Sequence, residues 1–320
     1  MNRYFLVFYI AIMVSLETRA QQDPQFSQYM FNNLVINPAY AGYKENLNVS
    51  AVYRNQWVGV EGSPKTQTFI VDGSVANDKV GLALGVVNDK YGLRGKFTGY
   101  LNYSYKLFVG EEGVLALGLA GGISQYTYDS DKATYEEEQE TGFLQGKYSY
   151  IDPEARFGIH YSTNRFFIGF SATNLFSQMF SSGKPIREMV TNQNNHFFLS
   201  AGYLFDLNEY LKCKPTLLIK EDIKGPTGID GNLNFLIMDK VWIGGSYRSN
   251  FDLWKKNIGN KINGSAVVGM LQFVNDTWNI GYSYDYSTSS LKSFNSTHEI
   301  SVGFVLSKSK DLKILNPRYF

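Results

Sequence analysis

The chain is poor in cysteine and histidine and carries almost no net charge, and each of these scarcities removes a class of protein. Cys213 is the single cysteine, so it cannot form a disulfide within the chain, and no CxxC or His/Cys cluster has metal-ligand spacing. The 30 Lys and Arg are balanced by 29 Asp and Glu, without the basic stripe that binds nucleic acid. The 30 glycines form no Walker pattern and no strand–GxGxxG–helix context. We therefore expect no metal, no cofactor and no nucleic-acid partner.

Catalytic constellations are missing as well. His160, His196 and His298 each fall on a different expected strand. A barrel-type hydrolase would need a Ser and a His within hydrogen-bond reach, with an Asn or Asp to orient the His. The spacing proposes no such set, so we expect no catalytic residues and do not expect an enzyme.

The first 20 residues have the layout of a secretory signal peptide. Arg3 precedes an apolar run from Tyr4 to Leu16, and the small residue Ala20 suits a cleavage site. The alternative is a membrane anchor, but the run has only about 13 apolar positions, whereas a spanning helix needs about 20. We expect cleavage after Ala20 and export of the remaining chain.

Long apolar runs are absent after this leader, but aromatic residues are abundant. Phe, Trp and Tyr make up 16% of the chain, with 23 Tyr and 23 Phe. Barrels of the bacterial outer membrane place such residues in girdles at both membrane interfaces. Because no later segment is long and apolar enough for a spanning helix, a membrane location would require a closed barrel.

Residues alternate with a period of two along most of the chain past residue 46. Between Trp278 and Tyr286, every second residue is aromatic or Ile, and the residues between them are Asn, Gly, Ser and Asp. Similar alternation occurs over 97–107 and 299–306. This pattern predicts half-buried strands, but a soluble β-sandwich would show it too.

The lengths of the connections favour a barrel. Short links follow the even-numbered strands and longer ones follow the odd-numbered strands, including 128–149 and 174–195. Short periplasmic turns and long external loops are typical of outer-membrane barrels, whose strand number is even. The sequence therefore predicts an all-β, antiparallel transmembrane barrel. We place its fourteen strands near 46–54, 66–75, 79–88, 95–108, 113–127, 150–162, 165–173, 196–206, 210–220, 227–238, 240–249, 262–274, 276–287 and 296–307.

This strand count gives a simple domain layout. A signal peptide at 1–20 is followed by an irregular N-terminal periplasmic or plug segment at 21–45, the barrel at 46–307 and a C-terminal periplasmic tail at 308–320. An even number of strands puts both mature termini on the periplasmic side. The N-terminal segment therefore begins in the periplasm, and it either stays there or folds up into the lumen.

Two predicted external loops carry unusual residues. The acidic run at 136–140 is either a cation site, since carboxylates are hard oxygen ligands, or a solvated rim. The loop at 174–195 contains the apolar residues Phe176, Met179 and Phe180, which a solvated loop does not need. This loop either contacts a partner or folds inward.

Three motifs stand out near the start of the mature chain: DPQFSQYM at 23–30, NPAYAG at 37–42 and RNQW at 54–57. The first two are expected at or inside the periplasmic end of the barrel, and RNQW toward the outer rim. They would then act together only across the lumen.

Each motif has a structural interpretation and a functional one. In NPAYAG, Pro38 restricts the preceding residue to extended geometry, and Gly42 can adopt a positive φ. These features fit an entry turn that fixes the register of the barrel. Alternatively Tyr40, with Phe26 and Tyr29, anchors a plug or a partner surface through aromatic contacts.

The other motifs lie at the ends of strands. In RNQW, Arg54 is expected to form an inward ion pair in the lumen, and Trp57 fits the outer aromatic girdle. The chain ends in NPRYF, in which Pro317 breaks strand pairing and Phe320 resembles the terminal aromatic of barrel insertion signals. We expect this tail to extend into the periplasm, where it could bind a partner.

Taken together, these motifs resemble those at the two ends of the PorP/SprF family of outer-membrane proteins, which serve the type IX secretion system of Bacteroidetes. The resemblance implies an outer-membrane barrel that docks or anchors secreted surface proteins for the secretion and gliding machinery. It implies two kinds of partner, namely periplasmic or lipoprotein components of the machinery and secreted adhesins held through their C-terminal domains. The candidate partner-binding or plug residues are Asp23, Pro24, Phe26, Gln28, Tyr29, Asn37, Pro38, Tyr40, Gly42, Arg54, Gln56, Trp57, Pro317, Arg318, Tyr319 and Phe320.

An alternative function comes from a different class. A fourteen-stranded barrel has room for an aqueous or ligand-binding lumen, so the chain could be an outer-membrane channel or solute transporter with a plugged or open lumen.

Overall fold

The computed structural model describes residues 25–44, 46–132, 146–176, 179, 185–191, 194–222, 226–251, 263–288 and 296–307. The expected signal peptide, the acidic run at 136–140 and the tail at 308–320 lie outside these residues.

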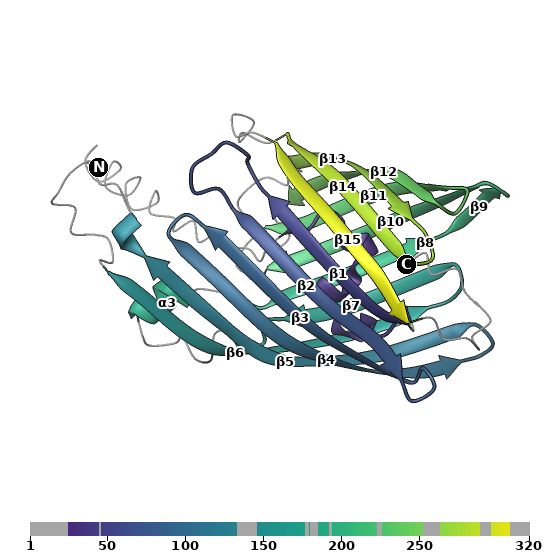
Figure 1. Ribbon diagram of the computed structural model, residues 1–320, viewed down its shortest axis with the longest axis horizontal. Coiled ribbons are helices and arrows are strands. Elements are labelled where there is room, and N and C mark those ends of the chain that lie inside the picture. The colour runs from purple at the N-terminus through teal and green to yellow at the C-terminus, as the bar shows by residue number, and fades with distance from the viewer. Residues whose placement is uncertain are drawn as a thin grey trace, which may run out of the picture.

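The described strands form one closed antiparallel barrel (Figure 1). Each strand pairs with its neighbour in sequence, and pairing of β1 with β15 closes the ring. The short β9 continues β8 after an interruption at Leu204, so the fifteen strands make fourteen barrel strands. Their bounds are β1 Leu47–Asn55, β2 Lys65–Val75, β3 Val80–Tyr91, β4 Arg94–Val109, β5 Gly113–Asp129, β6 Lys147–Ser162, β7 Phe166–Thr173, β8 His196–Tyr203, β9 Phe205–Asn208, β10 Leu211–Asp222, β11 Thr227–Ile237, β12 Val241–Phe251, β13 Asn263–Val274, β14 Trp278–Ser287 and β15 Thr297–Ser307.

The fourteen-stranded fold predicted from the sequence is confirmed, and the strand bounds agree to within about three residues. One detail of the prediction is wrong. The link between β3 and β4 was expected to be one of the longer ones, but both strands extend until Tyr91 pairs with Arg94. Only Gly92 and Leu93 remain between them, and the φ of +53° at Gly92 fits a two-residue hairpin. The strict short–long alternation therefore fails at this connection.

The barrel still has two unlike ends. The end formed by the β2–β3, β4–β5, β6–β7, β11–β12 and β13–β14 connections has only tight turns, and we call it the turn end. The other end, the loop end, carries the connections at 130–146 and 174–195. In outer-membrane barrels the turn end is periplasmic and the loop end is extracellular.

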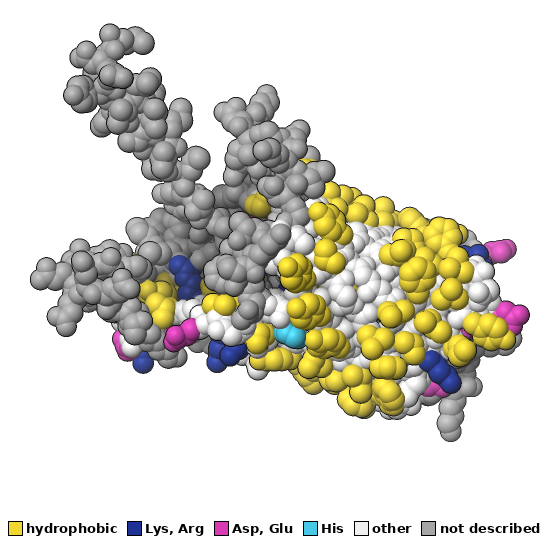
Figure 2. All heavy atoms as spheres, turned by 90° about the horizontal axis from the view of Figure 1, so that it is seen from above, with side chains coloured by type: hydrophobic (Ala, Val, Ile, Leu, Met, Phe, Trp, Pro, Cys, Tyr) yellow, Lys and Arg dark blue, Asp and Glu magenta, His cyan; other side chains and the backbone are white. Residues whose placement is uncertain are grey.

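The alternation in the sequence sorts side chains between the lipid face and the lumen. Leu101 is 64% exposed on the outer face of β4, whereas the adjacent Asn102 is 3% exposed and points inward. Trp278, Tyr282 and Tyr284 on β14 likewise face outward. Figure 2 shows hydrophobic side chains spread over the outer face, with charged side chains toward its two ends. The outer surface is therefore apolar and the inner surface polar, as a membrane barrel requires.

Helices are a minor part of the fold. The 3₁₀ turns η1 Tyr29–Phe31, η2 Asn33–Val35 and η3 Pro38–Tyr40 precede the barrel, η4 Ser130–Lys132 follows β5, and α3 Pro185–Thr191 precedes β8. Over the described ranges, none of the helices has the length and apolar character needed to cross a bilayer.

Residues 25–44, which we call the lumen segment, fill the inside of the barrel. Tyr29, Met30, Leu34 and Tyr40 are each less than 5% exposed, and they form a hydrophobic cluster with wall residues such as Ile70. The sequence left open whether this segment stays in the periplasm or enters the lumen. Its described part lies in the lumen.

We predict that the cost of an outward charge depends on its depth in the membrane. Leu101 lies at the middle of β4 and Leu306 next to the turn end of β15, and they are 64% and 63% exposed. Leu101→Arg should lower the free energy of unfolding by about 2–4 kcal/mol and Leu306→Arg by about 0–1 kcal/mol. Urea unfolding in lipid vesicles, followed by tryptophan fluorescence, measures both. Equal losses would contradict the membrane placement of the barrel.

Candidate functional site

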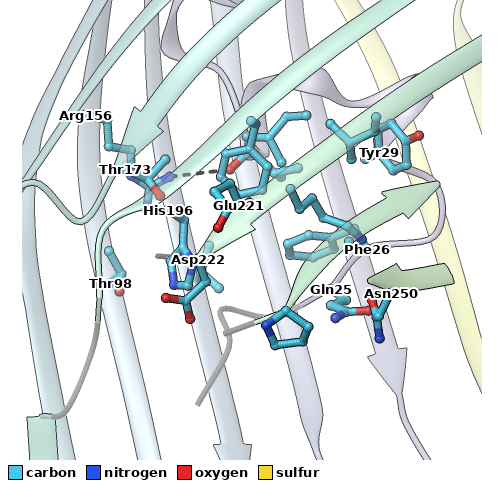
Figure 3. A pocket seen from close by; sticks show the side chains of 18 of the residues that line it. Gln25, Phe26, Tyr29, Thr98, Arg156, Thr173, His196, Glu221, Asp222 and Asn250 are labelled. Atoms are coloured by element: carbon cyan, nitrogen blue, oxygen red, sulfur yellow. Dashed lines mark hydrogen bonds between the residues drawn. The ribbon is translucent and has the colours of Figure 1, made fainter. Parts of the chain in front are cut away.

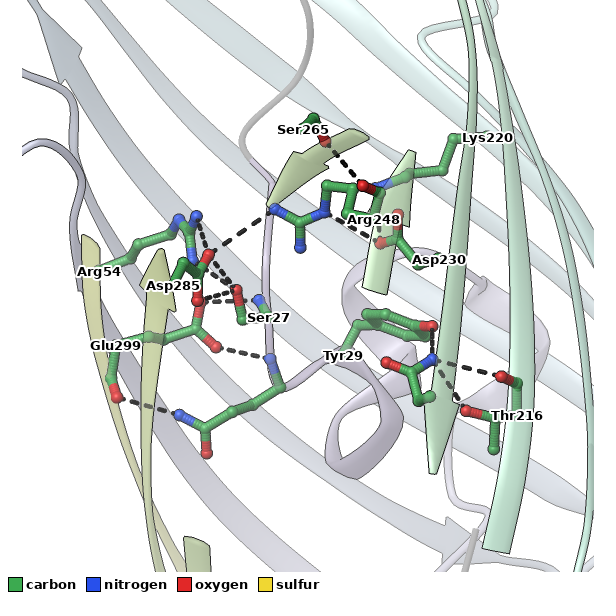
Figure 4. A network of polar contacts seen from close by, with 12 residues as sticks. Ser27, Tyr29, Arg54, Thr216, Lys220, Asp230, Arg248, Ser265, Asp285 and Glu299 are labelled. Carbon is green, nitrogen blue, oxygen red and sulfur yellow. Dashed lines mark hydrogen bonds and ion pairs between the residues drawn. The ribbon is translucent and has the colours of Figure 1, made fainter. Parts of the chain in front are cut away.

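The loop-end part of the lumen segment is held by a buried ion pair network around Arg54. The Arg54 guanidinium lies 2.8 Å from Asp285 Oδ2 on β14 and 3.1 Å from Glu299 Oε2 on β15. Its Nη1 also donates to Ser27 Oγ at 2.8 Å, and Ser27 Oγ donates to Asp285 at 2.6 Å (Figure 4). One arginine therefore joins the barrel wall to the lumen segment.

Glu299 fixes the backbone at the start of η1. Its two carboxylate oxygens accept from the backbone N–H groups of Ser27 and Gln28 at 2.9 and 2.8 Å. The Gln28 side chain donates to the Glu299 carbonyl and accepts from Ser301 Oγ. A carboxylate suits this position because the first N–H groups of a helical turn have no partner within the turn.

The network continues across the wall as a ladder of alternating charges. Arg248 on β12 lies 3.7 Å from Asp285 and 3.3 Å from Asp230 on β11, and Asp230 pairs with Lys220 on β10 at 2.8 Å. With Arg54 and Glu299, the ladder contains three cations and three carboxylates. Buried charges are costly unless they are paired, and this set of cations and carboxylates is balanced.

Tyr29 makes the next polar contact along the segment. Asn232 on β11 donates to the Tyr29 hydroxyl at 2.5 Å and to Thr216 Oγ1 at 3.0 Å. Burial raises the pKa of the Tyr29 phenol above its ordinary value, and the nearby Asp230 carboxylate raises it further. The phenol therefore stays neutral and acts as a hydrogen-bonding anchor for η1.

The NPAYAG motif attaches the segment to the opposite wall. Asn37 Oδ1 accepts from the backbone N–H of Ala39 at 2.9 Å, which caps η3, and Pro38 occupies the first position of that turn. The Asn37 amide also donates to the carbonyls of Ile159 on β6 and Phe170 on β7. One side chain thus both starts the turn and binds it to the barrel.

Glycines in the wall allow this close contact. A Cβ added at Gly118 on β5 would lie 2.1 Å from Ala39 N, and one at Gly158 on β6 would lie 2.0 Å from Asn37 Oδ1. Gly42 ends the motif with a φ of +65° beside the β2–β3 turn, in a conformation that other residues rarely adopt. The backbone of the NPAYAG motif therefore lies directly against the wall at Gly118 and Gly158.

Two cavities remain beside the lumen segment. One of about 90 Å³ is lined by Gln25, Phe26, His196, Glu221 and Asp222, whose side chains surround it in Figure 3. The other, of about 410 Å³, lies toward the turn end, between the segment and strands β1 and β12–β15. Residues of the lumen segment line both cavities, with Val35 and Ile36 at the first and Leu34 and Tyr40 at the second.

Two of the three histidines have structural surroundings, and His196 lines the smaller cavity. His160 packs against the rings of Tyr40, Tyr43 and Phe167, with centroids 5.3–5.8 Å away. His298 lies outside on β15, where it bonds the Tyr282 hydroxyl at 2.7 Å. Within the described residues, no group of three or more His, Cys, Asp or Glu side chains is arranged to hold a metal ion.

The structure brings together motifs that the sequence placed at opposite ends. The described part of DPQFSQYM, residues 25–30, does not begin at the periplasmic floor, because Ser27 contacts Arg54 of RNQW in the loop-end half of the lumen. Phe26, Gln28, Tyr29, Asn37, Pro38, Tyr40, Gly42 and Arg54 all belong to the lumen segment or its contacts. Gln56 and Trp57 lie in the β1–β2 connection, with Trp57 half-buried against Thr297. Asp23, Pro24, Pro317, Arg318, Tyr319 and Phe320 lie outside the described residues.

Several residues of this site did not follow from the motifs. Asp230, Arg248, Asp285 and Glu299 hold the network, and none belongs to a motif. In the sequence, each of them could be recognised as a charged residue at a strand position whose side chain points into the lumen. Such a residue needs a partner in the lumen, and the strand pattern does not say which one.

Comparison with known proteins gives one family and several distant structures. The chain matches the family model described as type IX secretion system membrane protein PorP/SprF over residues 18–304. Among curated proteins, none matches the chain.

Solved structures similar to the chain include the outer membrane protein Omp33 of Acinetobacter baumannii, with 9% identity and a TM-score of 0.47 over 82% of this chain and 98% of that one. A Pseudomonas aeruginosa FadL homologue has 10% identity and a TM-score of 0.43 over 89% and 95% of the two chains. The KdgM porin has 8% identity and a TM-score of 0.37 over 81% and 99%.

We predict that the Arg54 pair stabilises the barrel far more than an exposed pair does. Arg54→Met leaves the carboxylates of Asp285 and Glu299 buried without their main cation, which should cost about 3–5 kcal/mol. The matched control is Arg165→Met, because Arg165 pairs with Asp206 at 2.7 Å but is 59% exposed, and this change should cost about 0–1 kcal/mol. Urea unfolding compares the two, and a similar loss in both would show that the network is not a structural support.

Proposed function

Because this chain belongs to the PorP/SprF family of type IX secretion system membrane proteins, we propose that it is a docking barrel that holds or passes secreted surface proteins for this machinery. The observation that carries the proposal is the filled lumen. An outer-membrane barrel whose interior is occupied by its own chain offers its two ends, and not a pore, to other molecules.

The way in which the lumen is filled supports docking over transport. The lumen segment is bound at the loop end by the Arg54 network and near the turn end by Asn37 and the wall glycines. Between these attachments, Tyr29, Leu34 and Tyr40 pack into an apolar cluster. A weakly held gate would not need buried ion pairs at one end and close backbone contact at the other.

The loop end carries apolar residues suited to a protein partner. Phe176, Met179 and Ile186 are 43%, 75% and 43% exposed. The helix that carries Ile186, α3, is fixed to the barrel through Val190, which packs on Tyr126 and other rings of the wall. The helix of this loop therefore folds inward onto the wall, while Phe176, Met179 and Ile186 keep apolar side chains exposed to a partner. Secreted surface proteins are the partners that we propose here.

The turn end would face the periplasmic parts of the machinery. The lumen segment passes into β1 at this end, and β15 ends here at Ser307. We propose that periplasmic or lipoprotein components bind at this end, and that the last residues of the lumen segment, near Gly42, and the tail at 308–320 contribute to it. The lumen segment itself then acts as a plug.

A channel or solute transporter is the second candidate, and the two cavities favour it. They lie on either side of the lumen segment, so displacement of that segment would join them. The loop end and the turn end of the barrel would then be connected through the lumen.

We predict that loss of this protein changes which proteins reach the cell surface. A strain without the gene should lose one or more secreted proteins from its surface, and complementation with the intact chain should restore them. The measurement is a quantitative comparison of surface and culture-medium proteins. If the exported set is unchanged, the secretion role is wrong.

We also predict a closed lumen that opens when the plug is removed. The intact protein should give no steady conductance in planar bilayers, and removal of residues 21–44 should give open pores. Gly158→Ala, which disturbs the Asn37 contact, should give intermittent openings, and Gly121→Ala, where a Cβ meets no atom within 4 Å, should stay closed. Steady pores from the intact protein would favour the channel.

A further inference from the structure

The wall of the barrel is uneven at the loop end, where β6 runs far past its neighbour β7. β6 begins at Lys147, but its pairing with β7 starts only at Phe157. The eight residues 147–154 extend over about 26 Å at the usual rise of 3.3 Å per residue. Along this stretch β6 pairs with β5 on one side only, and Figure 1 shows these long strands with α3 beside their far ends.

The backbone groups of alternate residues point to this open side. The Ala155 carbonyl accepts from Leu175 N there, and the Ile151 carbonyl accepts from Arg187 Nη2. Because successive residues of a strand point their N–H and C=O groups to opposite sides, Lys147 and Ser149 share this direction. No described residue bonds the backbone groups of Lys147 or Ser149 on that side.

The outermost part of the open stretch lies beyond the membrane. On the outer face of β6, Ile151 is 59% exposed, and the outward residues past it are Ser149 and Lys147. On β5, Ile123 is 56% exposed and is followed outward by Gln125. The change from apolar to polar outward residues marks the outer boundary of the membrane. The edge from Lys147 to Ser149 is therefore on the extracellular side.

The surrounding side chains leave this edge open and limit its length. Arg187 on α3 binds Asp152 and the Ile151 carbonyl, and it lies over the ring of Tyr150. The helix α3 therefore covers the inner face of β6, and its hydrogen bond to the edge of this strand is made at the Ile151 carbonyl. Pro153 points to the same side but has no N–H, so it cannot donate to a further strand. With respect to the described residues, what remains is a short open edge, 147–151, which ends toward the membrane at Pro153.

We propose that the β6 edge at 147–151 binds an extended strand of a secreted surface protein by β-strand addition. Unpaired N–H and C=O groups at strand spacing are satisfied by another strand, which supplies the same groups in reverse. This inference rests on the proposed docking function, and it names how the exported partner is held. Ile151 and Ser149 on the outer face would meet alternate side chains of the added strand.

Proline at position 149 tests the edge without disturbing the barrel. Ser149 N–H points away from β5, so Ser149→Pro removes an edge donor while the β5–β6 ladder stays intact, as it does at Pro153. The matched control is Ser149→Ala, which changes the side chain alone. Both variants should keep the heat-dependent gel shift of a folded barrel.

The two variants are compared in a strain that lacks the gene. The proteins that disappear from the surface in this strain should return with the intact chain and with Ser149→Ala. They should stay reduced at least tenfold with Ser149→Pro. Full return with Ser149→Pro overturns the edge assignment and leaves the docking function standing. If nothing disappears from the surface in the deletion strain, the docking function itself fails.

Hydrogen exchange gives a direct reading of strand addition. In the purified complex with a protein lost from the deletion strain, the amides of Ser149 and Ile151 should exchange at least tenfold more slowly than in the free barrel. Unchanged exchange at both amides overturns the proposal. A second copy of this chain paired through the same edge would slow exchange without the secreted protein and double the particle mass, and this result would also overturn it.

Discussion

The pairing of buried charges in the lumen is the constraint on which the rest of the structure depends. An outer face in contact with lipid must be apolar, so the alternation of a strand puts its polar residues inside. Those residues include three cations and three carboxylates that a narrow lumen cannot hydrate fully. Arg54 resolves this by pairing with Asp285 and Glu299 and by binding Ser27 of the lumen segment. The network that neutralises the wall therefore also fixes the plug.

The plug is held by two different kinds of contact. Near the turn end, Gly118 and Gly158 remove side chains from the wall, and the backbone of NPAYAG lies directly on the strands. At the loop end, the contact is made by charged groups. Between these contacts, Tyr29 and Leu34 lie in an apolar cluster. A filled interior moves the proposed function to the two ends of the barrel, where the β6 edge has backbone groups that no described residue bonds.

Much of the fold could be predicted from the sequence, because strand formation and membrane placement depend on local patterns. The alternation in β14 separates Trp278 and Tyr282 from Asp285, and the structure places them outside and inside as expected. The prediction of a longer link between β3 and β4 was wrong because both strands run on until a Gly–Leu pair closes the hairpin. Strand ends set a few residues too early made this turn look like a loop. The site was harder to predict. The motifs pointed to the lumen segment, but nothing near Arg54 in the sequence indicates its carboxylate partners.

By itself, the sequence determined the number of strands, the lipid face and the inward phase of each polar residue, since these follow from a period of two along the chain. Only the tertiary structure decided which inward residues meet. Ser27 and Asp285 are 258 positions apart, and they touch because the ring closes between β1 and β15 and the segment folds up into it. The tertiary structure also decided where β6 runs past β7, because this edge arises from the unequal lengths of two paired strands. Closure and register are properties of the whole barrel, and no local pattern contains them.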